Sequence, residues 1–203
     1  MSIVDWPALL IGLMVAFYWG RVIKLVLKTR KLTGRAANFW PPETLGRVLR
    51  VIWYPNVAAW IAVPLFSAFH ILTPRLAMPA AVHWVAFGLA CVAYFLTLKC
   101  WRKMGSDWRM GIDPLEKNTL IITGPYALVR HPIYALQCTL AILSVLVVPN
   151  LWMAIVAVLQ IVLLQWEARR EEKHMLNVHG DVYGNYIRQV GRFIPHGRYD
   201  ANA

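Results

Sequence analysis

Long apolar runs separated by polar segments dominate the pattern of this 203-residue chain. A transmembrane helix needs about 20 consecutive apolar residues. Three runs reach that length, at residues 6–27, 51–74 and 76–98. Each therefore predicts a membrane-spanning helix. In the first run, Arg21 and Lys24 lie in the last turns, where long basic side chains can reach the membrane surface.

The second and third runs carry two further signals. Pro55 and Pro64 lie inside the second run and predict a kink, because proline cannot donate the hydrogen bond that a helix interior requires. Only Thr73-Pro74-Arg75 separates the second run from the third. We therefore expect these two helices to form a tight hairpin.

A fourth apolar stretch, residues 132–166, contains no charged residue. As a single helix its 35 residues would extend roughly 52 Å, which exceeds the thickness of a bilayer core. Pro149-Asn150 lies near its middle and predicts a break. We therefore expect two antiparallel helices, at 132–148 and 151–166. The predicted fold is all-α and polytopic, with about five transmembrane helices.

Basic residues are distributed very unevenly between the two predicted membrane sides. Of 21 Lys and Arg, all except Arg75 fall in or beside the segments 28–50, 99–131 and 167–203. The positive-inside rule places these segments in the cytoplasm and the N-terminus outside. We expect an integral protein of the bacterial inner membrane, or alternatively of the endoplasmic reticulum.

Composition agrees with a membrane protein and excludes several other classes. Hydrophobic residues make up 59% of the chain and charged residues 15%, against about 25% charged in a soluble domain. The net charge of +11 is explained by membrane orientation, and no nucleic-acid motif is visible. The cysteines, Cys91, Cys100 and Cys138, form no CxxC pair, so neither a disulfide framework nor a metal site is implied. No obligate protein partner is evident.

Segment 118–134 brings polar residues to the start of the fourth predicted helix. Gly124-Pro125 indicates a turn, and His131-Pro132 indicates a helix start. Arg130, His131 and Tyr134 therefore gather at the membrane boundary, where a helix N-terminus and a guanidinium favour an anionic group. Taken alone, Arg130 and His131 are more typical of a positive-inside anchor with an interfacial histidine than of a binding site.

Segment 165–180 continues the fifth helix beyond the membrane, with Gly180 as its expected C-terminal stop. It carries Glu167, Glu171 and Glu172, three of the ten acidic residues. A solvated helix face is the usual explanation for such a run. The predicted hairpin, however, brings 171–172 close to 130–131. Cationic and anionic groups that meet at the cytoplasmic end of this hairpin suit a zwitterionic ligand.

Over residues 99–195 the chain resembles the superfamily of isoprenylcysteine carboxyl methyltransferases and phospholipid methyltransferases. The resemblance rests on the following motifs in order: Met104-Gly105-Ser106-Asp107-Trp108-Arg109, Gly124-Pro125-Tyr126, Arg130-His131-Pro132-Ile133-Tyr134, Glu171-Glu172, Tyr183-Gly184-Asn185-Tyr186 and Arg192-Phe193-Ile194-Pro195. Residues 1–98 hold the first three predicted helices and show no such motif, whereas residues 99–203 form the predicted methyltransferase region.

The resemblance implies S-adenosylmethionine as the methyl donor, bound in a cytoplasmic C-terminal cofactor pocket. The catalytic set it implies, in binding and orientation roles, is Arg130, Glu171 and Glu172. The cofactor contacts it implies are Asn118, Thr119, Leu120, Ile121, Tyr126, His131, Pro132, Ile133, Tyr134 and Glu171. Some family members have His in place of Asn118 and Phe-Gly in place of His179-Gly180. Prenylcysteine enzymes have a substrate-contacting Arg in place of Glu167, which disfavours a prenylcysteine carboxylate here.

The methyl acceptor implied by this resemblance is lipid-like, either an isoprenylcysteine-like carboxylate or a phospholipid amine. A membrane sterol reductase that uses NADPH is an alternative, because such enzymes share a similar C-terminal half. A non-enzymatic membrane protein is a second alternative. An ion-coupled transporter is disfavoured, because such proteins usually need ionisable residues inside the membrane. Predicted spans two to five contain no Asp, Glu, Lys or Arg, and His70 and His83 are their only histidines.

Overall fold

In the computed structural model, the described residues are 4–33, 39–41, 43–72, 75–105, 108 and 120–199. Within these ranges all the named elements are helices. The elements are α1 (Trp6–Thr33), α2 (Thr44–Ala68), α3 (Ala80–Met104), the 3-10 helix η2 (Gly124–Ala127), α4 (Pro132–Val147) and α5 (Leu151–Gln189). The all-α, polytopic prediction is confirmed.

At the basic end of the bundle, each of the first three helices extends beyond its apolar run. α1 continues to Thr33, α2 begins at Thr44, and α3 continues to Met104. The expected ends at residues 27, 51 and 98 were therefore too short. Hydropathy indicates where a helix leaves the bilayer, but the Lys, Arg and Leu residues that follow are good helix formers and continue the helix into the polar region.

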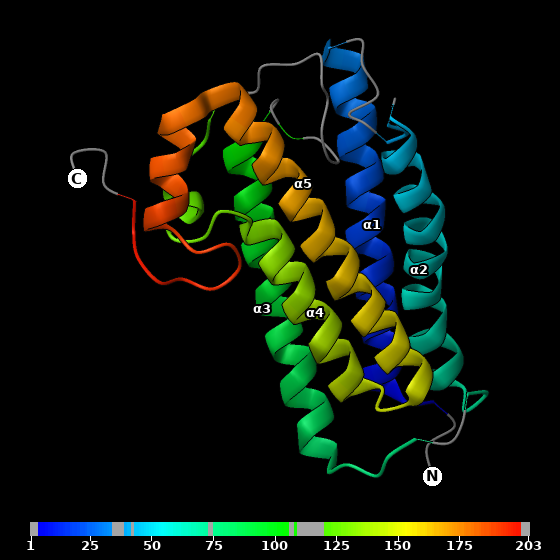
Figure 1. Ribbon diagram of the computed structural model, residues 1–203. Coiled ribbons are helices and arrows are strands. Elements are labelled where there is room, and N and C mark those ends of the chain that lie inside the picture. The colour runs from blue at the N-terminus through cyan, green and yellow to red at the C-terminus, as the bar shows by residue number, and fades with distance from the viewer. Residues whose placement is uncertain are drawn as a thin grey trace.

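The tight hairpin expected between the second and third helices is wrong. α2 ends at Ala68 and α3 begins at Ala80, so an eleven-residue connection, 69–79, joins them. Figure 1 shows α2 and α3 on opposite sides of the bundle, with α3 beside α4. α2 ends where the backbone leaves the helical region, with His70 at a positive φ of 59° just beyond its last residue. By contrast, α2 continues without interruption through Pro55 and Pro64.

The break expected at Pro149-Asn150 is confirmed. α4 ends at Val147, α5 begins at Leu151, and the Asn150 side chain accepts a hydrogen bond from the Met153 amide at 2.8 Å. Such an N-cap satisfies one backbone donor that the first turn leaves free. The short connection makes α4 and α5 an antiparallel, packed pair (Figure 1).

The end of the bundle opposite the start of α4 carries few charged side chains among the described residues. Asp5, just before α1, donates its amide to the Ala68 carbonyl at 2.9 Å, and its carboxylate pairs with Arg75. The Leu76 amide donates to the Pro149 carbonyl at 2.8 Å, so the chain just before α3 passes beside the α4–α5 turn. Arg75 thus lies at the end opposite the start of α4, as the charge distribution predicted.

Buried polar side chains connect four helices across the middle of the bundle. Gln137 of α4 donates to the Tyr18 hydroxyl of α1 at 2.6 Å, and Gln160 of α5 donates to Gln137 at 3.4 Å. Asn56 of α2 donates to Gln160 at 3.0 Å. Inside an apolar bundle such bonds both satisfy the polar groups and specify how the helices pack. Trp60 and Leu140 are among the large side chains that fill the surrounding core.

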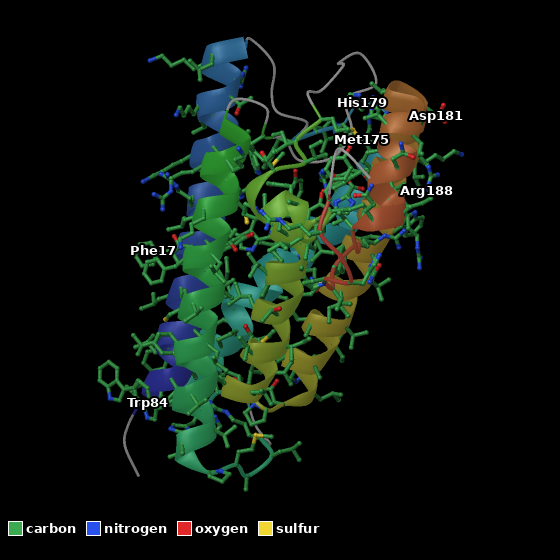
Figure 2. The ribbon with its side chains drawn as sticks, turned by 90° about the vertical axis from the view of Figure 1, so that its left-hand side faces the viewer. Phe17, Trp84, Met175, His179, Asp181 and Arg188 are labelled. Atoms are coloured by element: carbon green, nitrogen blue, oxygen red, sulfur yellow. The ribbon has the colours of Figure 1, made fainter. Side chains whose placement is uncertain are left out.

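Four of the described helices, α1, α2, α3 and α5, are long and apolar enough to cross a membrane. α4 has 16 residues, about 24 Å at 1.5 Å per residue, which is less than the roughly 30 Å of a bilayer core. Its crossing as a fifth span stays a prediction. Large apolar side chains face outward, including Phe17 at 71% exposed and Trp84 at 50% (Figure 2). The protein is a polytopic membrane protein.

Candidate active site

The start of α4 is fixed by backbone pairing with the C-terminal segment. Gly124, with φ of 66°, opens η2. Val129 then forms an isolated parallel bridge with Gly191, and the Arg130 amide bonds the Gly191 carbonyl at 2.8 Å. His131 bonds the Arg192 carbonyl at 3.0 Å and directly precedes α4. The predicted helix start at Pro132 is confirmed.

The end of α5 folds back onto this segment. Gly180 has φ 53° and ψ −129°, values that leave the helical region, and a further helical stretch continues to Gln189. Gly180 was expected to end the helix, but it turns it instead, because glycine adopts a positive φ without a steric penalty. Figure 1 shows the returning stretch beside the start of α4. The Tyr186 hydroxyl donates to the Tyr126 carbonyl at 2.5 Å.

A buried carboxylate ties these pieces together. Glu172 accepts from Arg130 Nε at 3.0 Å and from Arg192 Nη2 at 2.5 Å, and its side chain is 8% exposed. Burial disfavours a charged carboxylate, but hydrogen bonds from His131 and Arg192 and the charges of His131 and Arg130 outweigh it. They hold the pKa of Glu172 well below its usual range. We refer to Arg130, Glu172 and Arg192 as the arginine clasp.

Four of the five N–H donors of Arg130 are used within the chain, so this residue cannot form a bidentate pair with an external carboxylate. Its Nη1 donates to the Ile187 carbonyl at 3.1 Å and also to the Val190 carbonyl, while Nε and Nη2 bind Glu172. The bidentate clamp expected for a cofactor carboxylate is therefore occupied by a carboxylate of the chain itself.

Glu171 has a different environment, although it is the neighbour of Glu172. Its Oε1 accepts from the Tyr134 hydroxyl at 2.5 Å, and its Oε2 lies 3.4 Å from His131 Nδ1. No Lys or Arg among the described residues pairs with it. The His131 ring stacks on Tyr134, with centroids 5.5 Å apart. Burial alone lowers the pKa of His131, but Glu171 and Glu172 raise it overall, which favours the imidazolium.

Tyr126 contributes a buried hydroxyl that lacks a partner. The residue is 7% exposed, and its hydroxyl makes no hydrogen bond in the described structure. Burial, together with the nearby Cys100, Tyr186 and Glu171, raises the pKa of this phenol. A buried hydroxyl without a partner costs about 1–3 kcal/mol, so such a group needs an explanation. A ligand that bonds the hydroxyl would provide one.

The structure brings most of the expected site residues together. Arg130, His131, Tyr134, Glu171 and Glu172 form one contiguous cluster, as the predicted hairpin required. Of the other expected positions, Leu120 packs against Tyr183 and Tyr186, and Ile121 is half-buried. Pro132 is buried in the first turn of α4, and Ile133 packs on the core. Asn118 and Thr119 lie outside the described residues, as do Ser106, Asp107 and Arg109.

Sequence reasoning missed the role of the segment around Gly191. An added Cβ at this position would lie 1.9 Å from the Ile194 carbonyl oxygen, so only glycine fits the turn. The turn presents Arg192 to Glu172, and Arg192 had appeared only as part of a family motif. A glycine directly before an arginine was the available signal, but glycine alone does not indicate which chain segment approaches it.

A second buried ion cluster was also missed. Arg50 of α2 is 1% exposed and lies 3.5 Å from Glu167 of α5, which is 2% exposed. Glu167 also pairs with Arg170 at 2.6 Å, and Arg170 pairs with Glu43. Arg50 and Glu167 both interact electrostatically with Tyr134. This cluster joins α2 to α5 directly beside the candidate site.

A model of the family described as phospholipid methyltransferase matches residues 81–182, just over half of the chain. The chain belongs to the phospholipid methyltransferase family. It is therefore a membrane methyltransferase. The match begins inside α3, so the third helix shares the family pattern although its sequence showed no recognisable motif. No curated protein sequence matches the chain significantly.

Proposed function

We propose that this methyltransferase uses S-adenosylmethionine to methylate a phospholipid or lipid-like acceptor dissolved in the bilayer. One observation carries the cofactor assignment. Glu171 is held by Tyr134 and His131 with no Lys or Arg partner among the described residues, and it lies within electrostatic reach of the unpaired Tyr126 hydroxyl. A carboxylate held in this way suits a ligand that carries an ammonium and a sulfonium.

When bound, the cofactor would supply an electrophilic methyl group on a positively charged sulfur. Glu171 would attract the cationic part of that ligand, and Tyr126 would donate or accept one hydrogen bond. Tyr134 and His131 orient the Glu171 carboxylate through its two oxygens. The arginine clasp would not contact the cofactor itself. It holds the returning C-terminal segment against the start of α4. Arg130 and Glu172 are thus positioning residues in this proposal.

The acceptor assignment follows from the family and from the outward faces of the helices. A molecule dissolved in the bilayer reaches the protein along surfaces such as that of α3, where Val85 and Phe95 are 62% and 61% exposed. Apolar burial of about 0.8 kcal/mol per CH₂ concentrates such a molecule in the membrane. The methylation rate should therefore depend on the acyl chain length and membrane mole fraction of the acceptor. A short water-soluble analogue that reacted equally fast would contradict the proposal.

The decisive experiment measures cofactor binding in nanodiscs. Wild-type protein should bind S-adenosylhomocysteine, and Glu171→Gln should weaken binding by the 1.5–3 kcal/mol typical of a charge-assisted hydrogen bond, roughly 10-fold to 150-fold. Asp181→Asn is the matched control, because it removes one negative charge from an exposed position of the same helix (Figure 2). Equal affinity in the two variants, or preferential binding of NADPH by the wild type, would refute the proposal.

Tyr126→Phe provides an independent check, because it separates binding from stability. Removing a buried hydroxyl that has no partner should leave the unfolding temperature unchanged or slightly higher. If that hydroxyl bonds the cofactor, the same change should weaken S-adenosylhomocysteine binding. A variant with lower stability and unchanged affinity would show that the hydroxyl serves the fold alone.

We also propose that the site faces the cytoplasm of a bacterial cell, with the α4–α5 turn on the outer side. Single cysteines at exposed Leu151 and Asp181, in a variant that lacks the natural cysteines, should react with an impermeant reagent from opposite sides. Labelling of both positions from one side would contradict this topology and the crossing of α5.

A further inference from the structure

A groove between α1 and α3 lies away from the candidate active site. Its volume is about 560 Å³, and it is lined by one stripe of each helix. On α1 the stripe recurs every three or four residues from Leu10 to Lys24, a spacing that keeps side chains on one helix face. In Figure 2, Phe17 of this stripe projects on the side of the bundle opposite to Arg188.

Small residues make the groove hollow. Ala16 and Gly20 lie on its α1 side, and a Cβ added at Gly20 would meet no atom within 4 Å. The walls are formed by large apolar side chains, of which Phe17 is 71% and Phe95 61% exposed. The groove therefore has the volume and the apolar lining to accept a flexible hydrocarbon chain.

Two cations close one end of the groove. Arg21 and Lys24, three residues apart on α1, are exposed and form no ion pair with any described residue. Among the described residues that line the groove, no other is charged. From Leu10 to Lys24 the helix rises about 21 Å, so the apolar part extends from the two cations through at least one leaflet, whose core is roughly 15 Å thick.

We propose that this groove is a binding site for an anionic phospholipid, separate from the acceptor site. The phosphate is bound by Arg21 and Lys24, and one acyl chain lies along the apolar stripe toward Leu10. Basic pockets between transmembrane helices are suited to anionic headgroups. A zwitterionic lipid fits less well, because its ammonium would meet two cations that have no acidic neighbour in the groove.

The test compares two lipids that differ only in headgroup. Binding of phosphatidylglycerol and of phosphatidylcholine with identical chains is measured on the full chain in detergent by native mass spectrometry. The wild type should prefer phosphatidylglycerol. Each cation near an anionic headgroup contributes about a five-fold factor, so Arg21→Gln with Lys24→Gln should lower phosphatidylglycerol affinity roughly 25-fold. Absence of a headgroup preference in the wild type would overturn the proposal.

Matched controls separate this site from general electrostatics. Lys28→Gln with Arg30→Gln removes the same charge from exposed positions of the same helix beyond the groove, and it should change the affinity less than two-fold. An equal loss in both double variants would show a diffuse surface effect and overturn the assignment. Binding of S-adenosylhomocysteine should be unchanged in all of them, which keeps this result independent of the proposed function.

Filling the groove tests the acyl chain without changing any charge. Gly20→Leu should reduce phosphatidylglycerol binding, whereas Gly88→Leu should not, because Gly88 is an exposed glycine of α3 outside the groove. Both changes favour the helix, so the fold should be retained. If Phe17→Cys produced disulfide-linked dimers that excess lipid did not suppress, the occupant would be a second copy of the chain and the proposal would fail.

Discussion

Replacing Glu172 with glutamine removes the negative charge that holds two arginines and a histidine at the start of α4. The shape of the side chain is kept, but Arg130, His131 and Arg192 then repel one another. Removing one partner of a buried ion pair costs about 3–5 kcal/mol. We expect about 3 kcal/mol here, because Arg130 keeps two carbonyl acceptors and the Arg192 side chain is already 30% exposed.

The loss should be local, because the clasp joins the returning C-terminal segment to the rest of the bundle. The amides of Arg130, His131 and Tyr199 donate to the carbonyls of Gly191, Arg192 and Ala127, so their hydrogen exchange reports release of this segment. At 1.4 kcal/mol per factor of ten, a loss of 3 kcal/mol predicts roughly 100-fold faster exchange at these amides. Amides of the α4–α5 hairpin should keep their protection.

Asp181→Asn again serves as the charge-matched control and should leave the exchange unchanged. Low pH should act as Glu172→Gln does. Because the folded-state pKa of Glu172 is lowered, its contribution to stability is present above the unfolded value of about 4.3 and is lost as the pH falls through the folded pKa. Wild-type exchange rates in the glutamine variant would refute the view that this carboxylate anchors the segment.

Three further outcomes follow from the described contacts. The folded-state pKa of His131 is raised, so its contribution to stability is full below about pH 6.5 and is lost as the pH rises through the folded pKa. The unfolding temperature should therefore fall over that pH range. His131→Gln should make the unfolding temperature depend less on pH. Gly191→Ala should release the C-terminal segment in hydrogen exchange, whereas Gly184→Ala, with only an arginine tip 3.9 Å away, should stabilise by about 0.5–1 kcal/mol. Glu167→Leu should lower the unfolding temperature strongly, and adding Arg50→Met should restore much of it.

The sequence was informative where a short connection determines the geometry. Pro149-Asn150 inside an uncharged stretch left no alternative to an antiparallel pair of helices. That pair alone brings residues 130–131 to residues 171–172, although they are some 40 positions apart. The charged cluster was therefore predictable from local signals, and the distances between its members confirm it.

The sequence was uninformative where tertiary contacts decide the outcome. The hairpin expected between α2 and α3 failed because hydropathy shows that a helix is apolar without showing which helix it contacts. Arg50 was assigned to a polar loop, because a charge normally indicates the end of a membrane helix. Its partner Glu167 lies 117 positions away on another helix, and the distance between them depends on how α2 packs against α5.

Two adjacent glutamates serve different purposes because consecutive helical side chains point in different directions. Glu172 faces the arginine clasp and is neutralised by the chain itself, whereas Glu171 faces Tyr134 and His131. His131 contacts both carboxylates, at 3.4 Å in each case, so it transmits any change in the clasp to Glu171. The cofactor affinity of Glu172→Gln should consequently fall although Glu172 touches no ligand in this proposal. Because Arg130→Gln breaks the clasp from its other side, it should lower affinity through the same released segment, and the two losses should not add when the substitutions are combined.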